Sequence, residues 1–172
     1  MAKYLVTGAD GFIGSHLVEK LVTNGHDVRA MVFYNSFGSN GWLDNVDKKI
    51  IDSIDIVSAD IRDSELTKSL VEGCTHVIHL AAMMSIPYSY KAPRTFVETN
   101  VMGTLNILMA SRDLNIKKTI ITSTSEVYGT AQSVPMSEEH RLNAQSPYAA
   151  SKTAADQLSL SFFHSFGLPI TI

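Results

Sequence analysis

The chain has 172 residues, of which 45% are apolar, enough to bury one substantial hydrophobic core. Its formal net charge of −3 gives no general attraction to nucleic acid or to an anionic membrane surface, so we expect neither as a partner. No apolar run has the length of a membrane span and the first residues lack the pattern of a signal peptide. The single cysteine cannot form an internal disulfide, so we expect a cytoplasmic protein.

Short apolar runs alternate with amphipathic segments along the chain, the pattern typical of parallel βαβ units. The predicted strands are Lys3–Thr7, Val28–Phe33, Ile54–Ala59, Val77–Leu80, Thr119–Thr124 and Leu168–Ile172. The predicted helices are Ile13–Asn24, Ser64–Val71, Arg94–Leu114 and Pro147–Phe166. Residues 34–45 and 128–145 are rich in polar and turn-forming residues, so we expect two long loops. We therefore predict an α/β fold, a doubly wound parallel (Rossmann) sheet that forms one domain over residues 1–172.

Three glycines, Gly8, Gly11 and Gly14, lie where the first predicted strand turns into the first predicted helix. Glycine permits a tight turn and a close approach of the backbone to a pyrophosphate, and the helix N-terminus offers free N–H groups to phosphate. A glycine triplet alone is weak evidence, but its place between a strand and a helix indicates a dinucleotide-binding turn.

Tyr148 and Lys152 stand four residues apart at the start of a predicted helix, so their side chains share one face. A nearby ammonium favours the ionised form of a phenol, and such a tyrosine can take the proton of a substrate hydroxyl as hydride leaves the same carbon. We interpret the pair as catalytic.

The segment T-G-A-D-G-F-I-G at residues 7–14 resembles the T-G-x-x-G-F-I-G fingerprint of the extended short-chain dehydrogenases, the group of the nucleotide-sugar epimerases and dehydratases. The segments D-I-R-D at 60–63, H-L-A-A at 79–82 and F-V-E-T-N at 96–100 extend the resemblance over essentially the whole chain. The resemblance implies an NAD(P)-binding Rossmann domain followed by a smaller C-terminal substrate domain. We expect this chain, which ends in an apolar strand, to stop before that second domain.

The resemblance also implies which residues bind the cofactor: Gly8, Gly11, Phe12, Ile13, Gly14, Asp60, Ile61, Leu80, Ala81, Ala82, Thr99, Tyr148 and Lys152. The acid that accepts the adenosine ribose hydroxyls of NAD usually ends the second strand, but that place falls on Val32. Asn35 and Ser36 are expected to hydrogen-bond the cofactor instead. NAD is therefore the expected cofactor, and NADP stays open.

The segment 123–129 (S-T-S-E-V-Y-G) supplies the other expected catalytic residues. The resemblance assigns Thr124 to the reacting hydroxyl. It makes Glu126 the base that removes a C–H proton next to a ketone, as a 4,6-dehydratase requires, whereas simple 4-epimerases carry a non-acidic residue there. In the dTDP-glucose 4,6-dehydratases the general acid is an Asp at the place of Ser125, so Ser125 or a water would have to assist here.

Aromatic segments at residues 34–44 and 86–90 are similar to those of the dehydratases of legionaminic acid synthesis, which act on UDP- or GDP-linked N-acetylglucosamine. The predicted function is thus an NAD-dependent nucleotide-sugar 4,6-dehydratase that forms a 4-keto-6-deoxy sugar. The alternatives are a UDP-glucuronate-type decarboxylase, a UDP-sugar 4-epimerase and, from another class, a non-catalytic NAD(P)-binding fragment. The resemblance implies a homodimer formed through Arg94–Leu114 and Pro147–Phe166. The histidine spacing predicts no metal site.

Overall fold

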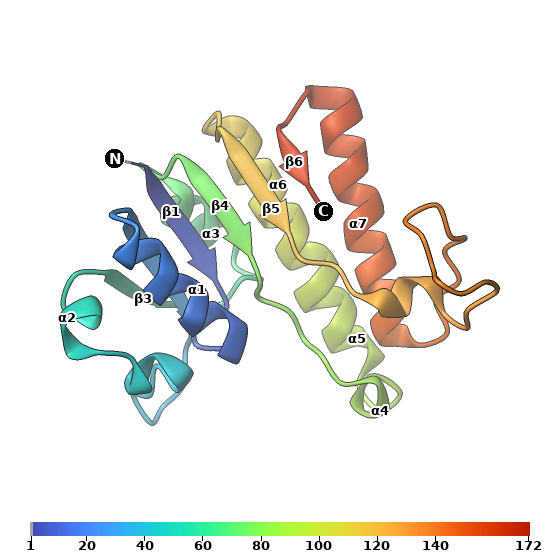
Figure 1. The fold of residues 1–172 in the computed structure, drawn as a ribbon, viewed down its shortest axis with the longest axis horizontal. Helices are drawn as coiled ribbons and strands as arrows, with labels where there is room; N and C mark the ends of the chain where they lie inside the picture. Colours follow the sequence, from blue (N-terminus) through green and yellow to red (C-terminus); the bar gives the residue numbers. More distant parts are fainter. Residues whose placement is uncertain (1) are drawn as a thin grey trace.

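The computed structural model describes residues 2–172, and over this range six parallel strands form one sheet in the order β3-β2-β1-β4-β5-β6. The strands are β1 (Lys3–Thr7), β2 (Asp27–Phe33), β3 (Asp55–Ala59), β4 (His76–His79), β5 (Lys118–Ile121) and β6 (Ile170–Thr171). All the pairings are parallel, with β1 and β4 side by side in the middle (Figure 1). The predicted doubly wound Rossmann sheet is confirmed.

The long connecting helices are α1 (Phe12–Thr23), α3 (Ser64–Val71), α6 (Gly103–Asp113) and α7 (Pro147–Phe166). Shorter segments are η1 (Gly41–Asn45), α2 (Lys48–Ile51), α4 (Ile86–Ser89), α5 (Pro93–Phe96), η2 (Val97–Met102) and η3 (Ser125–Tyr128). The helix predicted over residues 94–114 is present as the helical run α5–η2–α6, in which η2 is π-helical. The fifth strand ends at Ile121, three residues before its predicted end, and η1 interrupts the loop predicted over residues 34–45.

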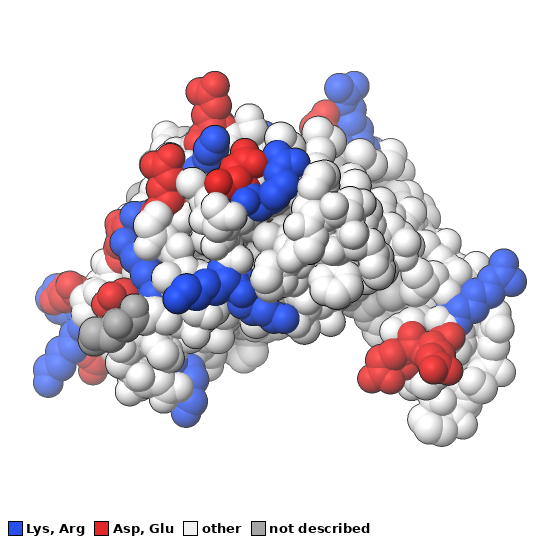
Figure 2. Space-filling model, turned by 90° about the horizontal axis from the view of Figure 1, so that it is seen from above, with Lys and Arg blue, Asp and Glu red and all other residues white. Residues whose placement is uncertain are grey.

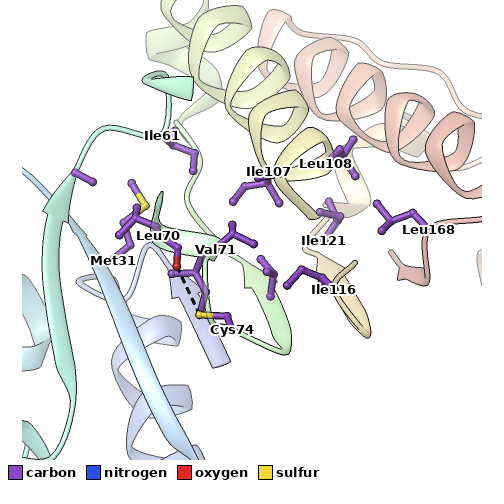
Figure 3. Close-up of a cluster of buried hydrophobic side chains, with 14 of the residues drawn as sticks. Met31, Ile61, Leu70, Val71, Cys74, Ile107, Leu108, Ile116, Ile121 and Leu168 are labelled. Atoms are coloured by element: carbon purple, nitrogen blue, oxygen red, sulfur yellow. Dashed lines mark hydrogen bonds between the residues drawn. The ribbon is translucent and has the colours of Figure 1, made fainter. Parts of the chain in front are cut away.

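A hydrophobic core lies on each face of the sheet, because the strands present apolar side chains to both sides. On one face, side chains of α1 and η1 such as Val18 and Leu43 cover Val6 and Val32. On the other face, α3, α6 and α7 cover the strands (Figure 3) with a larger cluster. Its members include Leu5, Val71, Val77, Ile107, Leu108, Ile121 and Phe162. Each such buried aliphatic side chain contributes about 1.5–3 kcal/mol relative to its exposed state.

Helix α1 lies directly on the turn that follows β1 because Gly14 has no side chain. A Cβ atom on Gly14 would lie 2.2 Å from the carbonyl oxygen of Gly8 and 2.7 Å from the Cα of Ala9. The contact is therefore backbone against backbone, and no relaxation of a flexible side chain can relieve an added methyl group.

His79, the last residue of β4, is buried between two threonines on neighbouring elements. Its Nδ1 lies 2.8 Å from Thr7 Oγ1 and its Nε2 lies 3.1 Å from Thr104 Oγ1. Thr7 Oγ1 already accepts the N–H groups of Leu80 and Ala81, so its O–H donates to Nδ1 and the proton of the neutral imidazole sits on Nε2. Burial lowers the pKa of His79 from 6.5 to about 3. His79 is therefore a neutral cross-link between β1, β4 and α6.

Charged side chains of both signs are mixed on the face seen in Figure 2, beside a wide uncharged surface, and no continuous field of one sign forms there. Within residues 2–172, no helix combines the length and the apolar character that crossing a membrane requires.

Replacing Gly14 with Ala should lower the free energy of unfolding by about 1–3 kcal/mol, because the new methyl group overlaps the Gly8 carbonyl. Urea unfolding of the protein measures the change. Glu19→Ala, at an exposed position of the same helix, serves as the control and should have little effect. A Gly14→Ala protein as stable as the wild type would contradict the described contact.

The protein should lose stability as the pH falls from about 6.5 toward 3, because the unfolded chain binds a proton at His79 that the folded chain excludes. The stability linked to this group is fully present above pH 6.5. Urea unfolding midpoints between pH 7 and pH 4 measure the slope, which His79→Gln should flatten while lowering stability at pH 7. His164→Gln, on an exposed residue of α7, should leave the slope unchanged. An unchanged slope in His79→Gln would show that another group carries the acid sensitivity.

Candidate active site

A cavity of about 810 Å³ lies at the carboxyl ends of the strands, where parallel α/β sheets bind ligands. Its walls come from the turn after β1, the ends of β2 to β5, the helical run α5–η2 and the start of α7. The lining residues include Gly8, Asp10, Gly11, Phe12, Ile13, Gly14, Met31, Phe33, Asp60, Ile61, Arg62, Leu80, Ala81, Ala82, Thr95, Thr99, Thr122, Ser123, Thr124, Tyr148 and Lys152. The cavity thus brings together the expected cofactor-binding residues except Asn35 and Ser36.

The glycine turn forms a wall of backbone. Gly8 has a φ of +68°, and a Cβ on it would lie 2.8 Å from the amide nitrogen of Ala81, which follows the neighbouring strand β4. Helix α1 follows at once, and its N-cap Gly11 supplies no side-chain cap, so the first N–H groups of the helix stay available to a ligand. A backbone cradle at a helix N-terminus suits the pyrophosphate of a dinucleotide, and the residues present fit NAD(P) at this end.

Asn35 and Ser36 do not line the cavity, contrary to the expected cofactor contact. The amide of Asn35 folds the loop after β2: its Oδ1 accepts the N–H groups of Phe37 and Ser39, and its Nδ2 donates to the carbonyls of Phe33 and Ser39. Sequence reasoning missed this because a short polar side chain in a turn bonds its own backbone as readily as a ligand. In the same loop, Trp42 meets Phe12 edge-on at 5.3 Å, beside the glycine turn.

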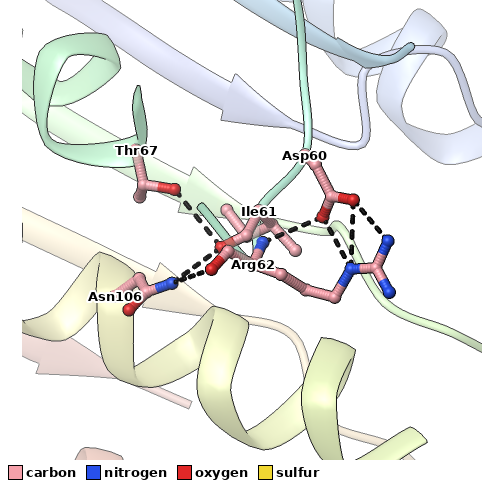
Figure 4. Close-up of polar contacts among 5 residues, drawn as sticks. All are labelled: Asp60, Ile61, Arg62, Thr67 and Asn106. Carbon is pink, nitrogen blue, oxygen red and sulfur yellow. Dashed lines mark hydrogen bonds and ion pairs between the residues drawn. The ribbon is translucent and has the colours of Figure 1, made fainter. Parts of the chain in front are cut away.

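The segment after β3 lines another wall of the cavity. Figure 4 shows the polar contacts that hold this segment in place. Asp60 accepts hydrogen bonds from Arg62 through Nε at 3.0 Å and through a terminal nitrogen at 2.5 Å. The Arg62 side chain holds the pKa of Asp60 below its ordinary value. Asn106 of α6 donates to the carbonyls of Ile61 and Arg62 at 3.0 and 3.1 Å, which fixes the segment on the helix.

Tyr148 and Lys152 line the cavity from the first turns of α7, the helix that Ser146 caps by accepting the N–H of Ala149. Tyr148 is half-buried, with its ring edge-on to Phe96 at 6.2 Å. Lys152 is buried, and its Nζ donates to the carbonyl oxygen of Thr122 at 2.5 Å. Burial lowers the pKa of Lys152 from 10.5. The pair therefore stands one helical turn apart at the cavity wall, with the ammonium fixed by the end of β5.

The segment that follows β5 holds the other expected catalytic residues. Thr124 lines the cavity and caps η3, since its Oγ1 accepts the N–H of Glu126 at 3.3 Å. Ser125 and Glu126 are exposed on η3 and lie outside the lining. Their side chains are open to solvent, and only the chain itself links them to the cavity, since they follow directly after Thr124.

A buried polar chain behind the cavity was not predicted. Asn100, inside the π-helical η2, donates from Nδ2 to Met83 O and Ser151 Oγ, both at 2.9 Å, and accepts Met83 N–H at 2.7 Å. Ser151 Oγ in turn donates to the Tyr148 carbonyl at 2.7 Å. The chain joins the loop after β4 to the helix of Tyr148. A π-helical turn is often found at a functional site, but the sequence carries no signal that places one here.

Asp156, one turn beyond Lys152, was also missed. It is buried, and Ser123 donates a short hydrogen bond to its Oδ2, while Oδ1 has no partner within the described part of the chain. Burial raises the pKa of Asp156, although Ser123 and Lys152 oppose the rise. The signal was present in the four-residue spacing from Lys152, which puts both side chains on one helix face. No cluster of three His, Cys, Asp or Glu with metal-binding geometry occurs among residues 2–172.

Comparisons with known proteins agree on the family. The family model for GDP-mannose 4,6 dehydratase matches residues 5–172. UDP-glucuronate 4-epimerase 1 of Arabidopsis thaliana is 35% identical over 97% of this chain and 40% of its own length. The structure of dTDP-glucose 4,6-dehydratase from Streptomyces venezuelae, with NAD and TYD bound, matches with a TM-score of 0.88 at 32% identity. That of UDP-glucose 4-epimerase from Thermotoga maritima, with UDP-glucose, matches with a TM-score of 0.87 at 30% identity.

Both structural matches cover 98% of this chain and 53% of the other chain, so the chain spans about half the length of the relatives that it matches. The match of the family model over residues 5–172 decides the assignment. The chain belongs to the nucleotide-sugar epimerase/dehydratase family of the extended short-chain dehydrogenases, and it corresponds to the Rossmann part of the family's members.

Proposed function

We propose that the protein is an NAD-dependent nucleotide-sugar 4,6-dehydratase, which converts a UDP- or GDP-linked hexose such as N-acetylglucosamine to its 4-keto-6-deoxy form. The observation that carries the proposal is the carboxylate of Glu126. Glu126 follows Thr124 by two residues in the chain, and Thr124 lines the cavity whose wall also holds Tyr148 and Lys152. Because this chain spans about half the length of its relatives, every test uses the full-length protein.

Four side chains have roles in the proposed reaction. Tyr148 takes the proton of the C4 hydroxyl, and Lys152, fixed on Thr122, supplies positive charge next to the phenolate. Thr124 orients that hydroxyl from the segment between β5 and η3. The glycine turn would hold NAD, which would supply the hydride acceptor for C4 and the hydride donor for C6. Glu126 removes the C5 proton, which the C4 ketone makes acidic. The C6 hydroxyl leaves as water with a proton passed to it through Ser125 or a bound water, and Glu126 returns a proton to C5 as hydride reaches C6.

A 4-epimerase is the second candidate, because relatives and solved structures at 30–35% identity carry that name. It shares the first step and needs no base at Glu126. The decarboxylase also shares that step, and the non-catalytic fragment would bind dinucleotide without turnover.

The predicted dimer through the two long helices stays a prediction. Exposed apolar side chains on those helices support it: Val97, Met102, Met109, Leu160, Phe163 and Phe166.

Product mass separates these functions. The full-length protein with NAD is incubated with UDP- and GDP-linked N-acetylglucosamine and with UDP-glucuronate, and the nucleotide sugars are analysed by mass spectrometry. A dehydratase gives loss of water. Unchanged mass with a new stereoisomer supports the epimerase, loss of carbon dioxide supports the decarboxylase, and dinucleotide binding without product supports the non-catalytic fragment.

Tyr148→Phe should lower the rate of product formation by about 10²–10⁴-fold, because the phenol that takes the hydroxyl proton is lost. NAD affinity should change little, since the glycine turn is untouched. Tyr4→Phe, at the amino end of the sheet, is the matched control and should keep full activity. A Tyr148→Phe enzyme with the wild-type rate would remove this tyrosine from the reaction.

Glu126→Gln should stop water loss while C4 oxidation continues, because only the removal of the C5 proton needs the carboxylate. Reduced nicotinamide, followed by its absorbance in single-turnover mixing, should then appear without the dehydrated product. Glu138→Gln, in the exposed loop before α7, serves as the control. Formation of the 4-keto-6-deoxy sugar at the normal rate by Glu126→Gln would show that another group is the base.

A further inference from the structure

The last three residues of β2, Met31, Val32 and Phe33, carry no oxygen or nitrogen on their side chains that could accept a hydrogen bond from the ribose of a dinucleotide. Rossmann domains that use NAD carry an acid there, about 20 residues beyond the glycine turn, to accept the ribose 2′-hydroxyl. In this chain Val32 is 1% exposed and belongs to the core under α1. The side-chain amide of Asn35 is already hydrogen-bonded to the backbone of its own loop, at Ser39. If the site discriminates between dinucleotides, the discriminating group comes from another element.

A carboxylate nevertheless lies at the end of β2: that of Asp10, which belongs to the glycine turn after β1. Its Oδ2 accepts the N–H of Phe33, the last residue of β2, at 3.3 Å, and both residues line the cavity. The half-buried side chain is therefore attached to the end of the strand whose own acid is missing.

The loop after β2 fixes the backbone of Asp10. Trp42 donates its N–H to the Asp10 carbonyl at 2.9 Å. Gly41, with a φ of +63°, lies so close that a Cβ on it would be 2.4 Å from the same oxygen. Asp10 is thus held from two sides, and its carboxylate has a defined position at the cavity wall.

The charge of Asp10 has no cationic partner nearby. It forms no ion pair within residues 2–172. Among the described lining residues the cations are Arg62, which is paired with Asp60, and Lys152, which donates to the carbonyl of Thr122 just after β5. An uncompensated carboxylate attracts a hydroxyl donor and repels a phosphate dianion.

We propose that Asp10 is the residue that selects NAD over NADP, by accepting a hydrogen bond from the adenosine 2′-hydroxyl and repelling a 2′-phosphate. The proposal rests on the dinucleotide binding that the proposed function requires, but not on the sugar reaction. In this protein the acid that discriminates between the cofactors would thus lie in the turn after β1, whereas in other NAD-binding Rossmann domains it lies at the end of β2.

Dissociation constants of NAD⁺ and NADP⁺ for the full-length protein test the proposal. Titration calorimetry measures them, and quenching of Trp42, the single tryptophan in the described chain, gives a local signal beside Asp10. The wild type should bind NAD⁺ more tightly. Asp10→Asn keeps an oxygen for the Phe33 N–H and removes the charge, so the ratio of the NADP⁺ to the NAD⁺ constant should fall by about tenfold or more.

Asp27→Asn is the matched control, because it makes the same change at the exposed opposite end of β2 and should keep the wild-type ratio. Thermal unfolding checks that Asp10→Asn is folded. A ratio within about twofold of the wild type in Asp10→Asn, or a wild type that prefers NADP⁺, overturns the proposal. If the ratio of dissociation constants shifts in Asp10→Asn but the wild-type protein dehydrates no sugar, the role of Asp10 is supported and only the proposed reaction is rejected.

Discussion

The site depends on one region of close contact in which backbone touches backbone. Gly8 lies against the amide of Ala81, two residues after β4, and Gly14 lies against the carbonyl of Gly8, at distances that leave no room for a Cβ. These approaches bring β1, α1 and β4 together at the carboxyl edge of the sheet, where the strand order reverses. The cavity opens at this point because the chain there consists of backbone groups, and backbone N–H groups are what a phosphate requires.

From this contact, hydrogen bonds reach the other half of the domain. Thr7 precedes the turn and bonds His79, which bonds Thr104 on α6; Thr104 in turn donates to the carbonyl of Asn100. Asn100 bonds Ser151 on the helix that carries Tyr148 and Lys152. The glycine turn and the helix with the tyrosine are thus joined by one buried network. A buried polar network rigidifies a core when every member has a partner, and this is the arrangement that a precise active site needs.

Much of this fold was predictable from the sequence, because strand and helix periodicities and the glycine turn act locally. Lys3–Thr7 and Ser64–Val71 have the predicted bounds. The short helices α2 and α4 were not predicted, since four residues carry too little periodicity. Contacts between residues distant in sequence were not predicted at the site: Asp10 meets Phe33 and Asp156 meets Ser123 only through the folded chain. A local pattern cannot show that Asn35 bonds its own loop while a residue 25 positions earlier lines the cavity.

The π-helical segment Val97–Met102 has a consequence for how this domain can vary. An α-helix turns by about 100° per residue, so the one extra residue of a π-turn shifts the phase of everything on its amino side. Phe96, before the π-helical segment, therefore points in a direction that differs from the one regular α-helical winding would give it relative to Ile107 and Leu108. All three side chains are nevertheless buried. Removing a single residue there would restore ideal winding and swing the upstream wall of the cavity away, whereas the same deletion near the carboxyl end of α6 would leave that wall in place.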